Sequence, residues 1–368
     1  MDRYELRRLD YGLSEDHRDV QAAYGKFFRA HSPIETVRAA EATGFDEKLW
    51  KRLCTMGATT MAVPEEFGGD GASLVDLTLI AEEIGRTLAP VPWIDHVCTT
   101  RLLARLDALG PNETWTTGLL TGARLAGFDP QLHPTSGRRL LPSGAVADHI
   151  VVRDGERVVA LAYDPRPAKV DNIARLPAAW IDPDVAAQSM VLGSGAVAVT
   201  TYLRAVYEWH LLTAAALVGL VDEAMTIAAE FAKTRYTLGV PIGTLQGISH
   251  PLANIAIAVQ SGRNLTHRAA WYLDNEPDER PELACAAFVF IAEEASKAAT
   301  AAAHVQGGLG VSLEAAATDY VLRARGWPLA GGDPGRVAQH IVDIVTTRER
   351  RHAPAGVLAA QTVNAEKG

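Results

Sequence analysis

Apolar residues recur with helical spacing in the first third of the chain. In the stretch "LVDLTLIAEEIGRTLA" they stand at 74, 77, 80 and 84, which places them on one face of a helix. Ser14 and Asp46 each precede another amphipathic stretch, and both are residues that favour the N-cap of a helix. The Pro and Gly residues of "VPEEFGGDGAS" (63–73) predict a loop between the helices before it and the helix that begins near residue 74. The pattern predicts helical blocks over 14–62 and 74–109.

The helical spacing disappears at about residue 115, and short β-type runs replace it. "HIVVRDGERVVALAYD" (149–164) has the alternation of two strands around the turn dipeptide Asp154-Gly155, which predicts a hairpin. "AQSMVLGSGAVAV" adds one or two further strands. A small β-domain is therefore expected between two helical blocks.

Long Ala-rich helical segments follow from about residue 201. Consecutive long helices with short links favour antiparallel packing in a bundle. The expected helices cover 202–237, 246–273 and 282–305, with shorter ones near 313–325 and 334–350. The fold class is thus α+β and mainly α. Three domains are expected: a helical one over 1–114, a β-domain over 115–200 and a helical bundle over 201–368.

Composition narrows the classes of function. The net charge is −9 and basic residues do not cluster, so nucleic acid is not an expected partner. Asp222 and Glu223 interrupt the most apolar run (211–232), so no membrane span is expected. The charged N-terminal stretch does not resemble a secretory signal, and three scattered cysteines fit a reducing, cytoplasmic setting. No spacing suited to a metal site is found.

Two segments at helix ends combine glycines with polar residues. One is "RYTLGVPIGTLQGISHPLANI" (235–255) and the other is "HVQGGLGVSLEAAATDYVLRAR" (304–325). Glycines allow phosphate groups to approach the backbone, and a following helix start offers free N–H groups. An arginine nearby, such as Arg235, would complete an anion site. Each segment taken alone also fits a plain helix cap beside a solvated cation.

Together, and in this order, these segments resemble the acyl-CoA dehydrogenase family. "AVPEEFGGDGASLVDLTLIAEEIGRTLAPVP" is similar to the family's Pro-Glu-Glu-Phe-Gly-Gly loop and the glutamate-rich helix after it. "RYTLGVPIGTLQGISHPLA" is similar to its Arg-x-x-Phe-Gly-x-Pro-Ile motif, although Thr237 and Leu238 replace the usual Gln-Phe. "QGGLGVSLEAAATDYVLRAR" is similar to its Gly-Gly-x-Gly segment. The resemblance covers nearly the whole chain.

The resemblance implies a helical domain, a small β-barrel-like domain and a four-helix bundle. It implies FAD as cofactor, bound at a subunit interface, and α,β-desaturation of an acyl-CoA substrate. Arg235 would contact the FAD pyrophosphate, and Gln246 with the Gly307-Gly308 region would reach the flavin nucleotide of a neighbouring subunit. His304 stands where the family usually has Gln, and Gln306 is displaced from that position by two residues.

The family's catalytic carboxylate is missing from its usual place. Alignment from Gly308 puts Gly331 where the glutamate base would be, and Asp333 two residues later is explained by helix capping. A family branch carries the base on the preceding long helix, at the position of Trp209. Glu208 beside it would point about 100° away unless the helix carried an irregularity such as a π-bulge. His210 is a base by chemistry alone.

The flavin-ring motifs expected near 120–150 are also absent, whereas the 235–250 motif is kept. Such a pattern resembles the non-catalytic chain of α2β2 family members in actinobacterial steroid degradation. We therefore expect a subunit that completes the FAD site of a paralogous partner, with a steroid side-chain CoA thioester as substrate. Two alternatives stay open: a self-sufficient dehydrogenase using Glu208 or Asp333, and a flavin-free scaffold or acyl-CoA binder.

Overall fold

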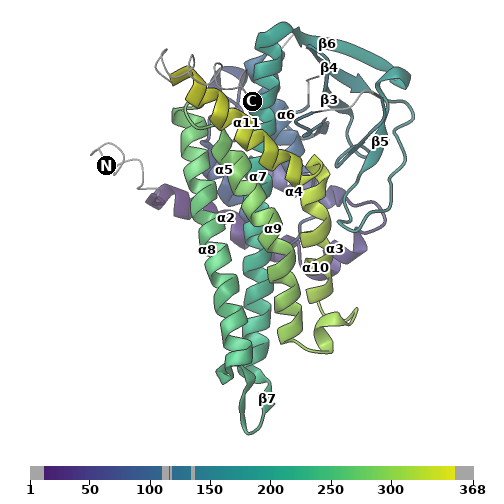
Figure 1. Cartoon of the computed structure of the whole chain (residues 1–368). Helices are drawn as coiled ribbons and strands as arrows, with labels where there is room; N and C mark the ends of the chain where they lie inside the picture. Colours follow the sequence, from purple (N-terminus) through teal and green to yellow (C-terminus); the bar gives the residue numbers. More distant parts are fainter. Residues whose placement is uncertain (1–11, 110–115, 117, 134–136, 353–368) are drawn as a thin grey trace, which may run out of the picture.

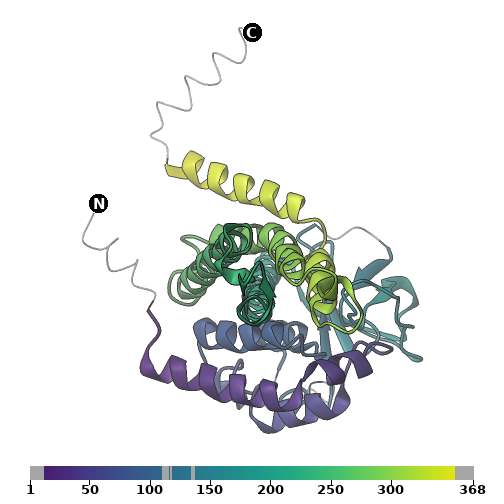
Figure 2. The ribbon, with the colours of Figure 1, turned by 90° about the horizontal axis from the view of Figure 1, so that it is seen from below.

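A computed structural model describes residues 12–109, 116, 118–133 and 137–352 of the 368-residue chain. Its central body is a bundle of long helices, with the β-strands beside one end of it (Figure 1). Viewed along the bundle, the N-terminal helices cover one side and the last helix, α11, lies on the opposite side (Figure 2). The expected mainly helical fold, with a small β-part between two helical blocks, is confirmed. The predicted domain boundary at 114/115 lies outside the described residues.

The N-terminal helices begin at the capping residues that the sequence indicates. Ser14 Oγ accepts the backbone N–H of His17 at the start of α2, and Asp46 caps α4 through the N–H groups of Lys48 and Leu49. Ser73 caps α5 in the same way. The helices are α2 (Glu15–His31), α3 (Ile34–Ala39), α4 (Glu47–Thr55), α5 (Leu74–Arg86) and α6 (Trp93–Arg105). The helix predicted over 93–109 ends earlier, at Arg105.

The β-strands form two sheets beside the bundle. The larger sheet has the order β1-β3-β4-β6, and β2 pairs with β5 in a second, two-stranded sheet. The predicted hairpin is present, since Asp154 pairs with Arg157 at the β3–β4 turn and Gly155 has a φ of 60°. The strands are β1 (Ala126–Phe128), β2 (Arg139–Leu141), β3 (His149–Asp154), β4 (Arg157–Ala162), β5 (Ala179–Ile181) and β6 (Gln188–Ser194).

Helix α7 is the centre of the bundle. It is continuous from Gly195 to Thr234 and packs against α5, α8 and α9. By length and composition it could cross a membrane, but 72% of its most apolar window is buried inside the protein. The following helices are α8 (Gln246–Asn275), α9 (Glu282–Val305), α10 (Ala317–Gly326) and α11 (Pro334–His352). Residues 313–316, expected to be helical, precede α10, which begins only at Ala317.

Two glycines let α5 and α7 approach backbone to backbone. A Cβ on Gly85 would lie 1.7 Å from the carbonyl oxygen of Ala216, and one on Gly219 would lie 1.9 Å from that of Glu82. Any side chain would therefore force the two helices apart. This close packing holds the N-terminal helices on the bundle.

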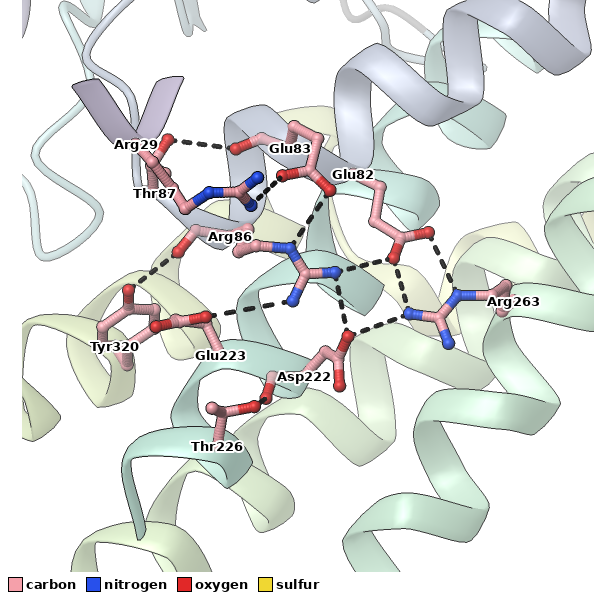
Figure 3. Close-up of polar contacts among 10 residues, drawn as sticks. All are labelled: Arg29, Glu82, Glu83, Arg86, Thr87, Asp222, Glu223, Thr226, Arg263 and Tyr320. Atoms are coloured by element: carbon pink, nitrogen blue, oxygen red, sulfur yellow. Dashed lines mark hydrogen bonds and ion pairs between the residues drawn. The ribbon is translucent and has the colours of Figure 1, made fainter. Parts of the chain in front are cut away.

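A buried ion network lies beside this contact and joins α5, α7 and α8 (Figure 3). Arg86 contacts Glu82 (3.0 Å), Glu83 (3.2 Å) and Asp222 (2.9 Å). Arg263 of α8 shares Asp222 with it, at 3.0 Å. Since the carboxylates of Glu82 and Glu83 are almost fully buried, they depend on these guanidinium groups for compensation.

Candidate functional site

Gly331, the position that the resemblance assigns to a catalytic base, faces Trp209. Gly331 ends the short 3₁₀ segment η5 (Trp327–Gly331), and Trp209 lies in the first half of α7. A Cβ added to Gly331 would lie 2.7 Å from Cζ3 and 3.1 Å from Cη2 of the Trp209 ring. Such distances are below carbon–carbon van der Waals contact. The indole therefore occupies the space into which a side chain at 331 would project.

Asp95 fixes the position of this indole. Trp209 Nε1 donates a hydrogen bond to Asp95 Oδ1 at 2.7 Å, and both residues are buried. Burial raises the pKa of Asp95 to about 6, although the hydrogen bond from Trp209 acts against the increase. A buried Trp usually needs a partner for its N–H, and here the carboxyl group of α6 supplies one.

Glu208 points to two arginines of α6. Arg101 Nε donates to Glu208 Oε2 at 3.0 Å, and Arg105 donates to Oε1. Burial favours the neutral carboxyl, but the two arginines outweigh it and lower the pKa of Glu208 to about 2. Helix α7 is α-helical throughout, without the π-bulge that would turn Glu208 toward the Trp209 side. The carboxylate is the anionic half of a buried ion cluster.

His210 and Asp333 have roles in packing and helix capping. The His210 ring is fully buried 4.7 Å (centroid to centroid) from Phe288, and burial lowers its pKa to about 3. Asp333 Oδ1 accepts the N–H of Gly335 at 2.9 Å in the first turn of α11, which is the capping contact expected for it.

The expected nucleotide-binding residues lie at the far end of α7. Arg235 follows the last residue of α7 and is exposed. A two-stranded hairpin, β7 (Tyr236–Thr237) and β8 (Val240–Pro241), comes next and forms the lower tip of the bundle (Figure 1). Gln246 is the first residue of α8, whose N-terminus has no side-chain cap. The guanidinium of Arg235, the amide of Gln246 and the uncapped start of α8 thus lie on either side of this hairpin.

The glycine segment follows α9 and continues into the 3₁₀ turn η4 (Leu309–Val311). A Cβ on Gly307 or Gly308 would have no neighbour within 4 Å, so the backbone is open to approach. His304 is exposed in the last turn of α9, whereas Gln306 is 6% exposed and directed inward. Of the two, His304 is the side chain available to a ligand.

The predicted residues therefore form separate groups. Glu208 and Trp209 lie within α7, with Gly331 packed against Trp209. Arg235 and Gln246 lie on either side of the β7–β8 hairpin, which forms the lower tip of the bundle (Figure 1). The donors at the lower end fit the pyrophosphate part of FAD, because anions bind at uncapped helix N-termini beside arginine. Gly331 has no side chain to accept a proton, and Glu208 is held by two arginines that lower its pKa to about 2.

Sequence reasoning did not identify Asp95, Arg101 and Arg105, which hold Trp209 and Glu208 in place. The spacing of Arg101 and Arg105, four residues apart on one helix, was a usable signal. It predicts two cations side by side on one face of α6. Which acid lies opposite is decided by helix packing.

Family models match both helical parts of the chain: the acyl-CoA dehydrogenase N-terminal domain over residues 14–114 and the C-terminal domain over 203–343. The chain belongs to the acyl-CoA dehydrogenase family. It is 26% identical over 328 residues to the acyl-CoA dehydrogenase IpdE2 of Mycolicibacterium smegmatis, covering 88% of this chain and 96% of that protein. FAD is accordingly its cofactor.

Two solved structures share the fold. One is the ChsE4-ChsE5 complex from Mycobacterium tuberculosis, with a TM-score of 0.77, 23% identity and coverage of 94% of this chain and 100% of that one. The other is a variant of Tcur3481-Tcur3483, described as a steroid acyl-CoA dehydrogenase. It has a TM-score of 0.81, 23% identity and coverage of 91% and 99%.

Proposed function

We propose that this chain is the non-catalytic subunit of a heteromeric, FAD-dependent acyl-CoA dehydrogenase in the cytoplasm. Family membership supports an oxidoreductase acting on acyl-CoA. In this proposal a paralogous partner supplies the catalytic base, and this chain supplies part of the nucleotide site. Heteromeric structures with the same fold, ChsE4-ChsE5 among them, support an assembly of this kind.

One observation carries the proposal: the place of the usual base is a glycine whose side-chain space is filled by Trp209. Glycine cannot accept a proton, and no larger residue fits without moving the indole. Glu208, the neighbouring carboxylate, has a pKa of about 2 because two arginines hold it. A carboxylate of that pKa is a weak base and is poorly suited to abstract an α-proton.

In this proposal the residues beside the hairpin at the lower end of the bundle bind the nucleotide part of FAD. Arg235 and the N-terminus of α8 would bind the pyrophosphate, and Gln246 would donate or accept a hydrogen bond beside it. The open backbone at Gly307 and Gly308 would allow close approach of the nucleotide. FAD, when bound, accepts the β-hydride during desaturation of the acyl-CoA. A steroid side-chain CoA thioester is the substrate class we propose, supported by the steroid enzyme among the similar structures.

Co-expression with a paralogous acyl-CoA dehydrogenase subunit tests the proposal. The pair should purify as a yellow complex with equal amounts of each chain, and it should desaturate acyl-CoA. The chain purified alone should bind FAD poorly and be inactive. Full activity of the lone chain would contradict the proposal, and absence of flavin with every candidate partner would favour a scaffold instead.

Three variants locate the roles within the pair. Arg235→Ala in this chain should release FAD from the complex, whereas substitution of the partner's base should leave FAD bound and abolish flavin reduction by substrate. Glu208→Gln provides the matched test of this chain's own carboxylate. Loss of flavin reduction in a stable Glu208→Gln complex that still holds FAD would assign the base to this chain.

A further inference from the structure

Arg323 is a buried cation without an anionic partner. It lies on α10 and is 4% exposed. Its guanidinium carbon lies 5.4 Å from the centroid of the Trp327 ring, a cation–π contact. In the part of the chain that the structure describes, Arg323 donates no hydrogen bond and forms no ion pair.

Asp319, the acidic residue on the same helix as Arg323, is already paired with other arginines. Asp319 lies one turn earlier on the same helix and is itself buried. Its Oδ2 accepts from Arg38 Nε (3.0 Å) and Nη2 (2.8 Å), and its Oδ1 accepts from Arg175. Arg175 also pairs with Glu41, at 3.1 Å, so Asp319 and Glu41 together balance Arg38 and Arg175. Arg323 is then the cation of this region that has no ion-pair partner among the described residues.

The charge of Arg323 cannot be removed by deprotonation at neutral pH. Burial lowers its pKa to about 10, with Arg175 adding to the effect and Asp319 opposing it. The guanidinium therefore stays protonated. An uncompensated charge at such a depth costs several kcal/mol of folding free energy, and buried ions in proteins are normally paired.

A small cavity adjoins this side chain. It has a volume of about 30 Å³, which suffices for one or two water-sized groups. Its walls are mostly apolar, since Pro90, Pro92, Pro142, Pro177 and Leu176 contribute to them. An apolar wall lowers the local dielectric constant and strengthens the attraction between a cation and an anion placed beside it.

We propose that the cavity beside Arg323 binds a small monovalent anion, of the halide or carboxylate kind. The planar guanidinium matches a carboxylate through two parallel hydrogen bonds and also accommodates a halide. The bound anion completes the charge balance of α10. This inference does not depend on whether the chain works in a heteromeric dehydrogenase.

Asp95 is the rival source of compensation, because it lines the same cavity. Its Oδ1 accepts the hydrogen bond of Trp209, and no ion pair within 4.0 Å joins its carboxylate to the Arg323 guanidinium. Compensation by Asp95 would need bridging water between the two groups. Water alone in the cavity is therefore the result that opposes an anion site.

Thermal unfolding of the full-length chain, in its purified assembly, tests the proposal. Chloride or formate is titrated at constant ionic strength, with a bulky sulfonate as the replacing anion. The melting temperature of the wild type should rise by roughly 4 °C at a hundredfold excess over Kd, since a ligand that binds only the folded state stabilises it. A melting temperature that does not respond to either anion overturns the proposal.

Arg323→Met is the decisive variant because methionine keeps much of the volume and removes the charge. Without small anions it should melt higher than the wild type, and its melting temperature should not respond to chloride or formate. Arg325→Met is the matched control: Arg325 lies on the same helix but is exposed, with Nη2 3.4 Å from Thr300 Oγ1. The control should keep the wild-type response. An unchanged response in Arg323→Met would refute the site.

Crystals grown in bromide locate the ion directly. An anomalous peak beside the Arg323 guanidinium is expected, and its loss on adding formate would identify a carboxylate site rather than a halide-selective one. Ordered water between Arg323 and Asp95, with bromide found only elsewhere, would overturn the proposal.

Discussion

Trp209 and Gly331 pack against each other from different parts of the sequence, with only 2.7 Å between Cζ3 of the indole and the position of a Cβ on the glycine. The indole is also tied to Asp95, so it cannot swing aside without losing a buried hydrogen bond. The absence of a carboxylate at 331 and the presence of a large ring at 209 are therefore two parts of one packing arrangement.

Gly331→Ala and Trp209→Ala should be strongly coupled. The added methyl group of Gly331→Ala should cost about 1–3 kcal/mol because it overlaps the ring. Trp209→Ala alone should cost about 3–5 kcal/mol through the cavity that it leaves. In the double variant the methyl group has room, so the total should fall below the sum by about 1 kcal/mol or more. Urea unfolding of the four proteins measures this coupling.

Gly247→Ala is a suitable control for the glycine substitution. Gly247 lies in the first turn of α8, and a Cβ there would have no neighbour within 4 Å. Its substitution should be neutral or stabilise by up to about 1 kcal/mol. Equal costs for Gly247→Ala and Gly331→Ala would contradict the steric role of Trp209.

Glu208→Gln should lower the free energy of unfolding by about 3–5 kcal/mol, because Arg101 and Arg105 would lose their buried counter-ion. The loss should shrink toward low pH. The folded-state pKa of Glu208 is about 2, below its ordinary value of 4.5, so its stabilising effect is present above pH 4.5 and disappears as pH falls toward 2. Unfolding curves of both proteins between pH 7 and pH 3 check this. A difference that does not change over that range would argue against the ion cluster.

Arg86→Leu should destabilise the protein by about 3–5 kcal/mol, because Glu82, Glu83 and Asp222 would share too few cations (Figure 3). Arg29→Ala is the control, since Arg29 is largely exposed and 3.9 Å from Glu83. It should cost less than about 1 kcal/mol. Chemical denaturation measures both, and similar costs would mean that the network does not stabilise the α5–α7 contact.

His96 should make the fold sensitive to mild acid. Ala126 N–H donates to His96 Nδ1 at 3.1 Å, so Nε2 carries the proton and donates to Leu119 O at 3.0 Å. Burial lowers the pKa of His96 from 6.5 to about 4. The stability that it supports is complete above pH 6.5 and falls by about 1.4 kcal/mol per pH unit down to pH 4. His96→Gln should lose part of this slope, which unfolding at several pH values would reveal. An identical slope in the two proteins would contradict it.

The helices and the hairpin were predictable because their signals are local. Ser14 and Asp46 act as N-caps as their residue types indicate, and the Asp154-Gly155 dipeptide forms its turn. The first turn of α10 was predicted too early, because residues 313–316 have a helical composition and yet precede the helix. Local composition alone does not fix a helix start that lacks a capping side chain.

The candidate site divides in the same way. The motif residues Arg235 and Gln246 could be placed near helix ends from the sequence, since Gly239 and Pro241 interrupt the helical pattern between them. The partners of Glu208 could not be placed, because Arg101 lies 107 residues away from it and meets it only through helix packing. The lack of an ion-pair partner for Arg323 within the described structure could not be predicted either, because helix packing decides which side chains surround it.

The family, the order of the helices and the glycine at position 331 could all be read from the chain, since they follow from residue identity and local spacing. Three features appear only in the folded protein: Trp209 fills the space beside Gly331, two arginines hold Glu208, and Arg323 is buried without an ion-pair partner in the part of the chain described. Burial and ion pairing depend on which side chains are packed together, and these side chains come from parts of the chain that are far apart in sequence.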